Sequence, residues 1–153
     1  MLRNLSAILR AGAVALALAA AAGPALVPAP AVAEEARPIF YNLTTDDAWS
    51  AGMALAQANA AADRGHAVTV FLNVRAVHLA DRDAVQGSFG PVGKKPAELL
   101  AALVGKGQTV LVCGMCMRAG GMTDGDLMEG ATISTPDLTF GAMTAPDAVV
   151  VSY

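Results

Sequence analysis

Two cysteines three residues apart are the residues of this chain best suited to chemistry, and they are the only cysteines among its 153 residues. Cys113 ends the short apolar run that begins at Val110, and Cys116 follows at the Cys-x-x-Cys spacing. Open α/β sheets usually hold their reactive groups beyond the carboxyl ends of their strands. We therefore place the candidate site at these two cysteines, and we expect both in the loop after the predicted strand, within disulfide reach.

Cys113 is the better candidate for a nucleophile. The thiolate rather than the thiol is reactive, so a reactive cysteine needs surroundings that favour its anion. Helix N-termini that face a strand end present dipoles of this kind, and Gly114 lets backbone N–H groups come close to the sulfur. The structural alternative is that Cys113 is only a small buried hydrophobe at the end of a strand.

Cys116 could assist the first thiol in two ways. It could resolve a persulfide or sulfenate formed on Cys113, or it could share a metal ion with Cys113, because the spacing fits redox and metal sites equally. A purely structural disulfide is disfavoured, since so small a ring constrains the unfolded chain only slightly. A thioredoxin-like motif is discounted because it opens a helix after an early strand, whereas this one follows the third predicted strand.

Soft sulfur ligands are concentrated around the two cysteines. Thiolates and thioethers suit Cu(I), so a copper site made by Cys113, Cys116 and Met117 is the alternative to thiol chemistry. Thiol chemistry itself requires no cofactor. Methionine also fills irregular gaps in hydrophobic cores, which would explain the enrichment without a metal. The methionines in question are Met115, Met117, Met122 and Met128.

Other polar side chains are candidates for a supporting role. His78 follows the second predicted strand, and it could be a base or a ligand, or simply a surface histidine. Arg75 and Arg118 could hold an anionic sulfur species, although solvated surface arginines are the common case. His66 begins a strand after a turn, so we expect it to be structural.

The N-terminal segment has the pattern of a secretory signal peptide. Arg3 and Arg10 supply positive charge, residues 11–22 form an apolar run, and residues 31–33 (Ala-Val-Ala) are a small-x-small cleavage site. We therefore expect residues 1–33 to be removed and the protein to be periplasmic. An uncleaved anchor is the weaker alternative, because the run is short and rich in alanine.

The expected mature part, residues 34–153, is long enough for one domain with a sizeable core. Removing the signal peptide removes two arginines and no acidic residue, which takes the formal net charge from −3 to −5. No run of basic residues is longer than Lys94-Lys95. This composition argues against nucleic-acid binding, and we expect no membrane contact after cleavage.

Apolar runs alternate with helical patterns along the mature part. Strands are expected at residues 39–43, 68–72, 109–113, 132–134 and 148–152. Helices are expected up to about residue 64, at residues 73–80 and 96–104, over a short stretch at 123–129, and from 135 to about 143. Five strands with intervening helices predict a three-layer α/β/α sandwich with a mainly parallel five-stranded sheet.

Two finer predictions concern the surroundings of the first long helix. Trp49, Met53, Ala56 and Ala60 recur at helical spacing, which predicts its buried stripe. Residues 81–93 are polar and rich in glycine, which predicts a mobile surface loop.

Three segments together resemble the DsrE/DsrF-like family, which includes the sulfur-relay subunits of the TusD type. They are the block Gly-His-Ala-Val-Thr-Val-Phe-Leu at residues 65–72, the strand at residues 110–113, and the ending from residue 130 to residue 153. The resemblance covers nearly the whole predicted domain. It implies the family's DsrE-like fold, a sulfur-accepting cysteine at Cys113 that can hold a persulfide, and assembly into trimers or hexamers.

Two classes of function follow from these observations. The first is a periplasmic DsrE-like protein that uses Cys113 and Cys116 for thiol and persulfide chemistry, exchanging sulfur with a donor or acceptor protein. The second is a Cu(I)-binding or partner-binding module of a homo-oligomer that catalyses nothing. The residues alone leave open whether the protein is an enzyme; if it is, we expect a sulfur carrier or a sulfurtransferase.

Overall fold

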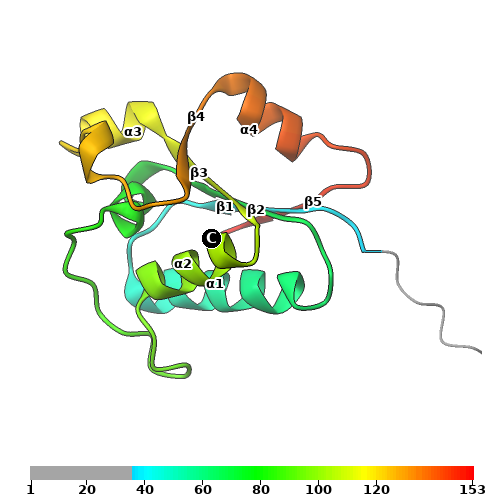
Figure 1. Cartoon of the computed structure of the whole chain (residues 1–153), viewed down its shortest axis with the longest axis horizontal. Coiled ribbons are helices and arrows are strands. Elements are labelled where there is room, and N and C mark those ends of the chain that lie inside the picture. Colours follow the sequence, from blue (N-terminus) through cyan, green and yellow to red (C-terminus); the bar gives the residue numbers. More distant parts are fainter. Residues whose placement is uncertain (1–35) are drawn as a thin grey trace, which may run out of the picture. The chain divides into compact units, whose positions relative to one another are not determined.

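Five short strands build one parallel sheet in the computed structural model, which describes residues 36–153 (Figure 1). The strands are β1 (Ile39–Leu43), β2 (Val68–Leu72), β3 (Thr109–Cys113), β4 (Ala131–Ser134) and β5 (Val149–Ser152). Their order across the sheet is β4-β3-β2-β1-β5, and every neighbouring pair is parallel. Parallel neighbours need long crossovers, and helices supply most of these. The predicted signal peptide lies outside the described residues.

The helices form a layer on each side of this sheet. The longer ones are α1 (Ala48–Ala62), α2 (Pro96–Gly105) and α4 (Pro136–Met143), and the shorter ones are α3 (Gly114–Ala119) and the 3₁₀ segments η1 (Val74–Ala80) and η2 (Asp124–Asp126). In Figure 1, α1 and α2 lie below the sheet, and α3 and α4 lie above it. This arrangement confirms the predicted α/β/α sandwich. None of the helices in the described part is long and apolar enough to cross a membrane.

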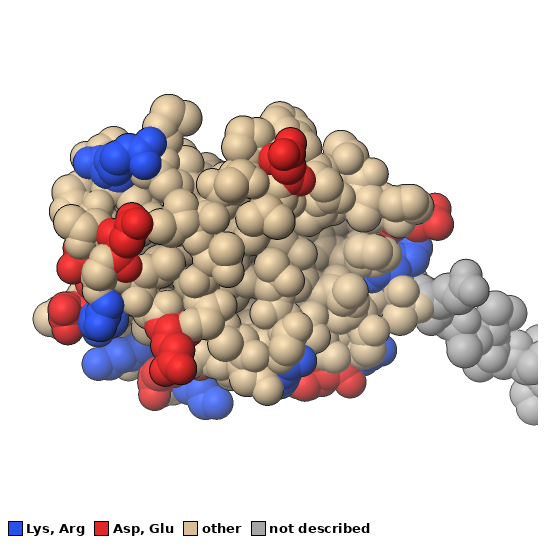
Figure 2. All heavy atoms as spheres, turned by 45° about the horizontal axis from the view of Figure 1, so that its top comes forward, with Lys and Arg blue, Asp and Glu red and all other residues tan. Residues whose placement is uncertain are grey.

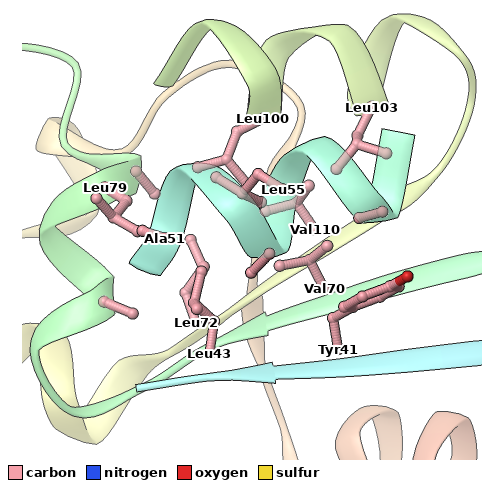
Figure 3. Close-up of a cluster of buried hydrophobic side chains, with 14 of the residues drawn as sticks. Tyr41, Leu43, Ala51, Leu55, Val70, Leu72, Leu79, Leu100, Leu103 and Val110 are labelled. Atoms are coloured by element: carbon pink, nitrogen blue, oxygen red, sulfur yellow. The ribbon is translucent and has the colours of Figure 1, made fainter. Parts of the chain in front are cut away.

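The main core lies between the sheet and the layer of α1 and α2 (Figure 3). Alternate strand residues point into it, because side chains along a strand alternate between the two faces. Each of the fully buried leucines contributes about 1.5–3 kcal/mol through burial. The side chains shown include Tyr41, Leu43, Leu55, Val70, Leu72, Leu100, Leu103 and Val110.

The predicted buried stripe of α1 is wrong for its largest members. Trp49 is 66% exposed and Met53 is 44% exposed, whereas Ala51 and Leu55 are buried. Small side chains let α1 lie close to the sheet, so the large residues are turned outward. Trp49 instead packs edge-on against Phe89, with ring centroids 5.6 Å apart.

The loop predicted at residues 81–93 has a buried anchor that the sequence pattern does not indicate. Phe89 is only 3% exposed, and its backbone N–H donates to the carbonyl of Lys94. Its ring fits closely over α1, where a Cβ on Gly52 would lie 2.4 Å from the Cγ atom of Phe89. The segment is therefore fastened to the helix layer and differs from the free loop that its composition predicts.

Candidate thiol site

The strand β3 delivers Cys113 to the carboxyl edge of the sheet. Its three central residues are buried, whereas Cys113 itself is half-buried. Cys113 pairs in register with Ser134, the last residue of β4. The site therefore lies where two neighbouring strands end together, as expected for an open parallel sheet.

The spacing predicted that the two cysteines share a loop, and this prediction is wrong, because α3 begins immediately after β3. Cys113 is the N-cap of this helix, and Cys116 is in its first turn. The backbone N–H of Cys116 donates to Cys113 Sγ over 3.3 Å. A thiol thus takes the place that a serine or threonine oxygen usually has at a helix start. The motif does open a helix, a feature that it shares with the thioredoxin-like arrangement.

Gly114 is required by the close approach of α3 to β4. A Cβ at this position would lie 2.9 Å from Ile133 Cγ2 and 3.6 Å from Arg118 Nη1. Ordinary carbon contacts are about 3.5–4.0 Å, so any side chain here would push the helix start away from the strand. The glycine between the two cysteines therefore fixes the position of both thiols relative to the sheet.

Cys113 opens into a cavity of about 490 Å³ between α3, β4 and α4. Its walls are largely apolar and include Phe71, Met115 and Phe140, and Arg118 is the charged residue that lines it. Of the two arginines proposed from the sequence, Arg118 is thus the one placed beside Cys113. A cavity of this size can admit a small thiol compound or the end of a partner's side chain.

Cys116 opens into a different cavity, of about 430 Å³, between α3 and η1. Arg75 and His78 line this cavity, together with Val74 and Gly120. His78 packs closely on the end of α3, because a Cβ on Gly120 would lie 3.0 Å from its ring atoms Cε1 and Nε2. The structure therefore groups Arg75 and His78 with the second thiol, separate from the cavity of Cys113.

Arg75 is already paired with a carboxylate. Its Nη2 and Nε atoms donate to the two oxygens of Asp46 over 2.7 and 3.0 Å. The hydrogen bond with Arg75 lowers the pKa of Asp46 below its ordinary value. Asp46 therefore offsets the charge of Arg75, and His78 is the side chain in this cavity that can act as a base.

The surroundings of Cys116 oppose its ionisation. Burial raises the pKa of the Cys116 thiol above its ordinary value, contact with the thiol of Cys113 raises it further, and the backbone amide of Val74 lowers it in part. The neutral thiol of Cys116 is therefore favoured over its thiolate more strongly than in an ordinary cysteine. It can donate a proton, and it becomes a nucleophile once a base removes that proton.

Val74, beside Cys116, has a strained backbone. Its φ of 51° lies in the left-handed region, which a β-branched residue very rarely adopts. The side chain is 58% exposed, so burial contributes little to hold this conformation. Strained residues of this kind cluster at functional sites, where surrounding contacts maintain them. Sequence reasoning missed Val74, because no glycine or asparagine marks the position.

The methionines near the cysteines have different environments. Met117 is 1% exposed and Met122 is 5% exposed, and both belong to the hydrophobic core. Met115 is 73% exposed and lines the cavity of Cys113. Within the described residues, no group of three or more His, Cys, Asp or Glu side chains could hold a metal ion.

The side of the molecule that carries α3 and α4 is largely uncharged. In Figure 2, which turns this side forward, acidic and basic side chains stand mainly towards the edges. Leu138 and Phe140 of α4 are 47% and 59% exposed. Phe140 also lines the cavity of Cys113, so this cavity has an exposed apolar side chain in its wall.

The comparisons with known proteins agree with this arrangement. The model of the DsrE/DsrF-like family matches residues 39–151, which include both cysteines and nearly all of the sheet. The chain belongs to the DsrE/DsrF-like family. No curated protein matches this DsrE/DsrF-like chain.

Solved structures share the fold. The ychN protein from E. coli is 21% identical, with a TM-score of 0.63, and the match covers 76% of this chain and 97% of that one. The protein MTH1491 from Methanobacterium thermoautotrophicum is 20% identical, with a TM-score of 0.56, covering 76% of this chain and 98% of that one. At this level of identity the likeness supports the fold of the DsrE/DsrF-like chain and does not by itself assign its chemistry.

Proposed function

We propose that this DsrE/DsrF-like protein is a periplasmic sulfur carrier that holds a persulfide on Cys113. The observation that carries the proposal is the position of that thiol. Cys113 ends β3 beside a cavity of about 490 Å³, and its sulfur receives a hydrogen bond from the N–H of Cys116. Family membership supports sulfur-relay chemistry of this kind.

The loading step is a transfer between thiols. The thiolate of Cys113 attacks the outer sulfur of a donor persulfide, the sulfur–sulfur bond of the donor breaks, and the donor leaves as a thiolate. The N–H of Cys116 donates to Cys113 Sγ, so it stabilises the attacking thiolate of Cys113 by a charge-assisted hydrogen bond. Arg118, which lines the same cavity, supplies positive charge.

Export and assembly belong to the same proposal. The sequence of residues 1–33 supports secretion, and family membership supports a homo-oligomer, a trimer or a hexamer. A sulfur donor or acceptor protein is the expected partner. The exposed apolar side chains Met115 and Phe140, which line the cavity of Cys113, offer such a partner a contact area.

Labelling with a persulfide donor tests the function. Cys113→Ser should abolish the gain of one sulfur atom seen by intact mass spectrometry, whereas Cys116→Ser should retain it. Met115→Leu, a conservative change in the same cavity, serves as the control and should label normally. Labelling of Cys113→Ser to the extent of the wild type would refute the assignment.

Cu(I) binding is the second candidate, because two half-buried free thiols lie together and thiolates are soft ligands. In that case Cys113→Ser and Cys116→Ser should each weaken copper binding strongly in a titration against a competing chelator. Met117→Leu tests whether the buried thioether also binds the metal, since the change conserves volume. Tight copper binding without any uptake of sulfur would favour this candidate.

A further inference from the structure

We infer that Cys116 is a resolving thiol. It expels the sulfur carried by Cys113 as hydrosulfide and leaves the two cysteines joined in a disulfide. An external dithiol then reopens this disulfide from the second cavity, the one between α3 and η1. This inference rests on the proposed persulfide of Cys113. It assigns to Cys116, Val74 and the cavity between α3 and η1 a role that a simple sulfur carrier does not need.

The positions of the two sulfurs support direct attack. Cys113 is the N-cap of α3 and Cys116 is three residues later, which places both side chains on one side of the helix start. The backbone N–H of Cys116 already contacts Cys113 Sγ over 3.3 Å. Both cysteines are free and half-buried in the structure. A nucleophile held this close to its target has an effective concentration far above that of any thiol in solution.

The resolving step balances without another reactant. The thiolate of Cys116 attacks the inner sulfur of the persulfide, which is Cys113 Sγ, and a bond forms between the two cysteine sulfurs. The bond from Cys113 Sγ to the outer sulfur breaks, and the outer sulfur leaves as hydrosulfide with the electron pair. The carried sulfur is thereby reduced and the two cysteines are oxidised. The proton lost by Cys116 passes through solvent or His78, which lines the same cavity, to the outer sulfur of the persulfide anion, so that this sulfur leaves as hydrosulfide and not as the dianion.

Recovery of the site requires a dithiol. Its first thiolate attacks Cys116 Sγ through the second cavity and forms a mixed disulfide, which frees Cys113 as a thiolate. Its second thiol then closes the dithiol into its own disulfide and frees Cys116, so two electrons pass from the dithiol to the protein. Because Cys113 and Cys116 open into different cavities, donor and dithiol approach from different sides of the site.

Val74, the residue with the strained backbone, lines the second cavity, through which the dithiol reaches Cys116. Val74 and Cys116 line the same cavity, and the backbone amide of Val74 acts to lower the pKa of the Cys116 thiol, which favours its anion. The attacking thiolate of Cys116 and the thiolate set free in recovery both carry this charge. Gly120 completes the wall, where a larger side chain would meet His78.

The test follows sulfur and disulfide in one sample of the full-length protein. The protein is loaded with cysteine persulfide, and trapped sulfide and intact mass are measured over time. The wild type should release one sulfide per chain and then lack two hydrogens relative to the dithiol. Cys116→Ser should keep its added sulfur on Cys113. It should release sulfide at about one hundredth of the wild-type rate or below, because the intramolecular attack is lost. Cys116→Ala should behave in the same way if the serine variant folds poorly.

Two matched substitutions on α3 separate the cavities. Ala119→Phe should slow reopening of the disulfide by dithiothreitol without slowing the loading of Cys113, because Ala119 is exposed and lines only the second cavity. Met115→Trp, in the first cavity, should slow loading and leave reopening unchanged.

Several results would overturn the inference. Sulfide release from Cys116→Ser at the rate of the wild type would exclude the resolving role. Added sulfur found on Cys116 in the wild type would show a relay between the cysteines instead. If Cys116→Ser loads sulfur and the wild type also retains it, only this inference fails. If no variant takes up sulfur, the proposed function fails with it.

Discussion

Replacing Gly114 by alanine should loosen the thiol site, and the structure sets the size of the effect. The new Cβ would lie 2.9 Å from Ile133 Cγ2, so α3 and β4 must separate by about 0.6 Å or more to reach an ordinary contact. Overpacking of this kind costs about 1–3 kcal/mol. Alanine recovers up to about 1 kcal/mol through its better helix propensity. The expected net loss is therefore about 0–3 kcal/mol of folding free energy, with a midpoint of about 1.5 kcal/mol.

Urea unfolding measures this loss, and a double-mutant cycle identifies its cause. Ile133→Ala removes the methyl group that Gly114→Ala would meet. The double variant should therefore be more stable than the sum of the two single losses predicts, by about 0.5–2 kcal/mol of unfolding free energy. Gly141→Ala is the matched control, because it lies in α4 and a Cβ there would meet nothing within 4 Å. We expect that control to stabilise the protein by about 0.5–1 kcal/mol.

Gly114→Ala should change the chemistry of the site as well as the stability of the protein. A displaced helix start moves the N–H of Cys116 away from Cys113 Sγ, so Gly114→Ala should load sulfur more slowly than Gly141→Ala. A Gly114→Ala protein as stable as Gly141→Ala, or a cycle without coupling to Ile133, would refute the claim that this contact positions the thiols.

Four further predictions concern thiol ionisation, the pH dependence of stability, export and assembly. Burial and contact with Cys113 raise the pKa of Cys116, so the rate of its alkylation by iodoacetamide should rise with pH through a midpoint above that of an ordinary thiol. Cys113→Ala should lower this midpoint. Site-resolved mass spectrometry measures both midpoints, and an unchanged midpoint in Cys113→Ala would contradict the assigned cause. Asp46 has a lowered pKa through its bond with Arg75, so the stability that this pair adds is present above the unfolded pKa of Asp46 and is lost as pH falls through its folded value. The stability of Asp46→Asn should therefore match that of the wild type in acid and fall below it near neutrality, as urea unfolding at each pH measures. The difference should be small, because the Arg75 side chain is largely exposed and solvent screens the pair. N-terminal sequencing of the exported protein should begin near Glu34, and recovery of only the full-length chain would count against the signal peptide. Light scattering should show a homo-oligomer, and a monomer at tens of micromolar would contradict that part of the proposal.

Local patterns in the sequence determined the strand that carries the chemistry. The apolar run that ends at Cys113 predicts a strand of the observed length, because a buried parallel strand is apolar on both faces. The alternation of strands and helices likewise determined the parallel sheet. The family resemblance was carried by the same local segments, and the family match confirms it.

The buried face of α1 was decided only by tertiary packing. The helix is apolar nearly all round, so helical spacing alone could not choose between Trp49 and Ala51. The choice depends on the close approach of α1 to the sheet and on Phe89, which comes from a loop far along the chain. Residue types show how apolar a helix face is, but not which face has room for a large ring.

The separation of the two thiols also depended on the tertiary structure. Spacing brings Cys113 and Cys116 together, since it is a property of neighbouring residues. Their different cavities arise because α4 follows β4 on one side and η1 follows β2 on the other, and these segments are distant in sequence. The left-handed backbone of Val74 goes against the local preference of a β-branched residue, so the residue type could not predict it.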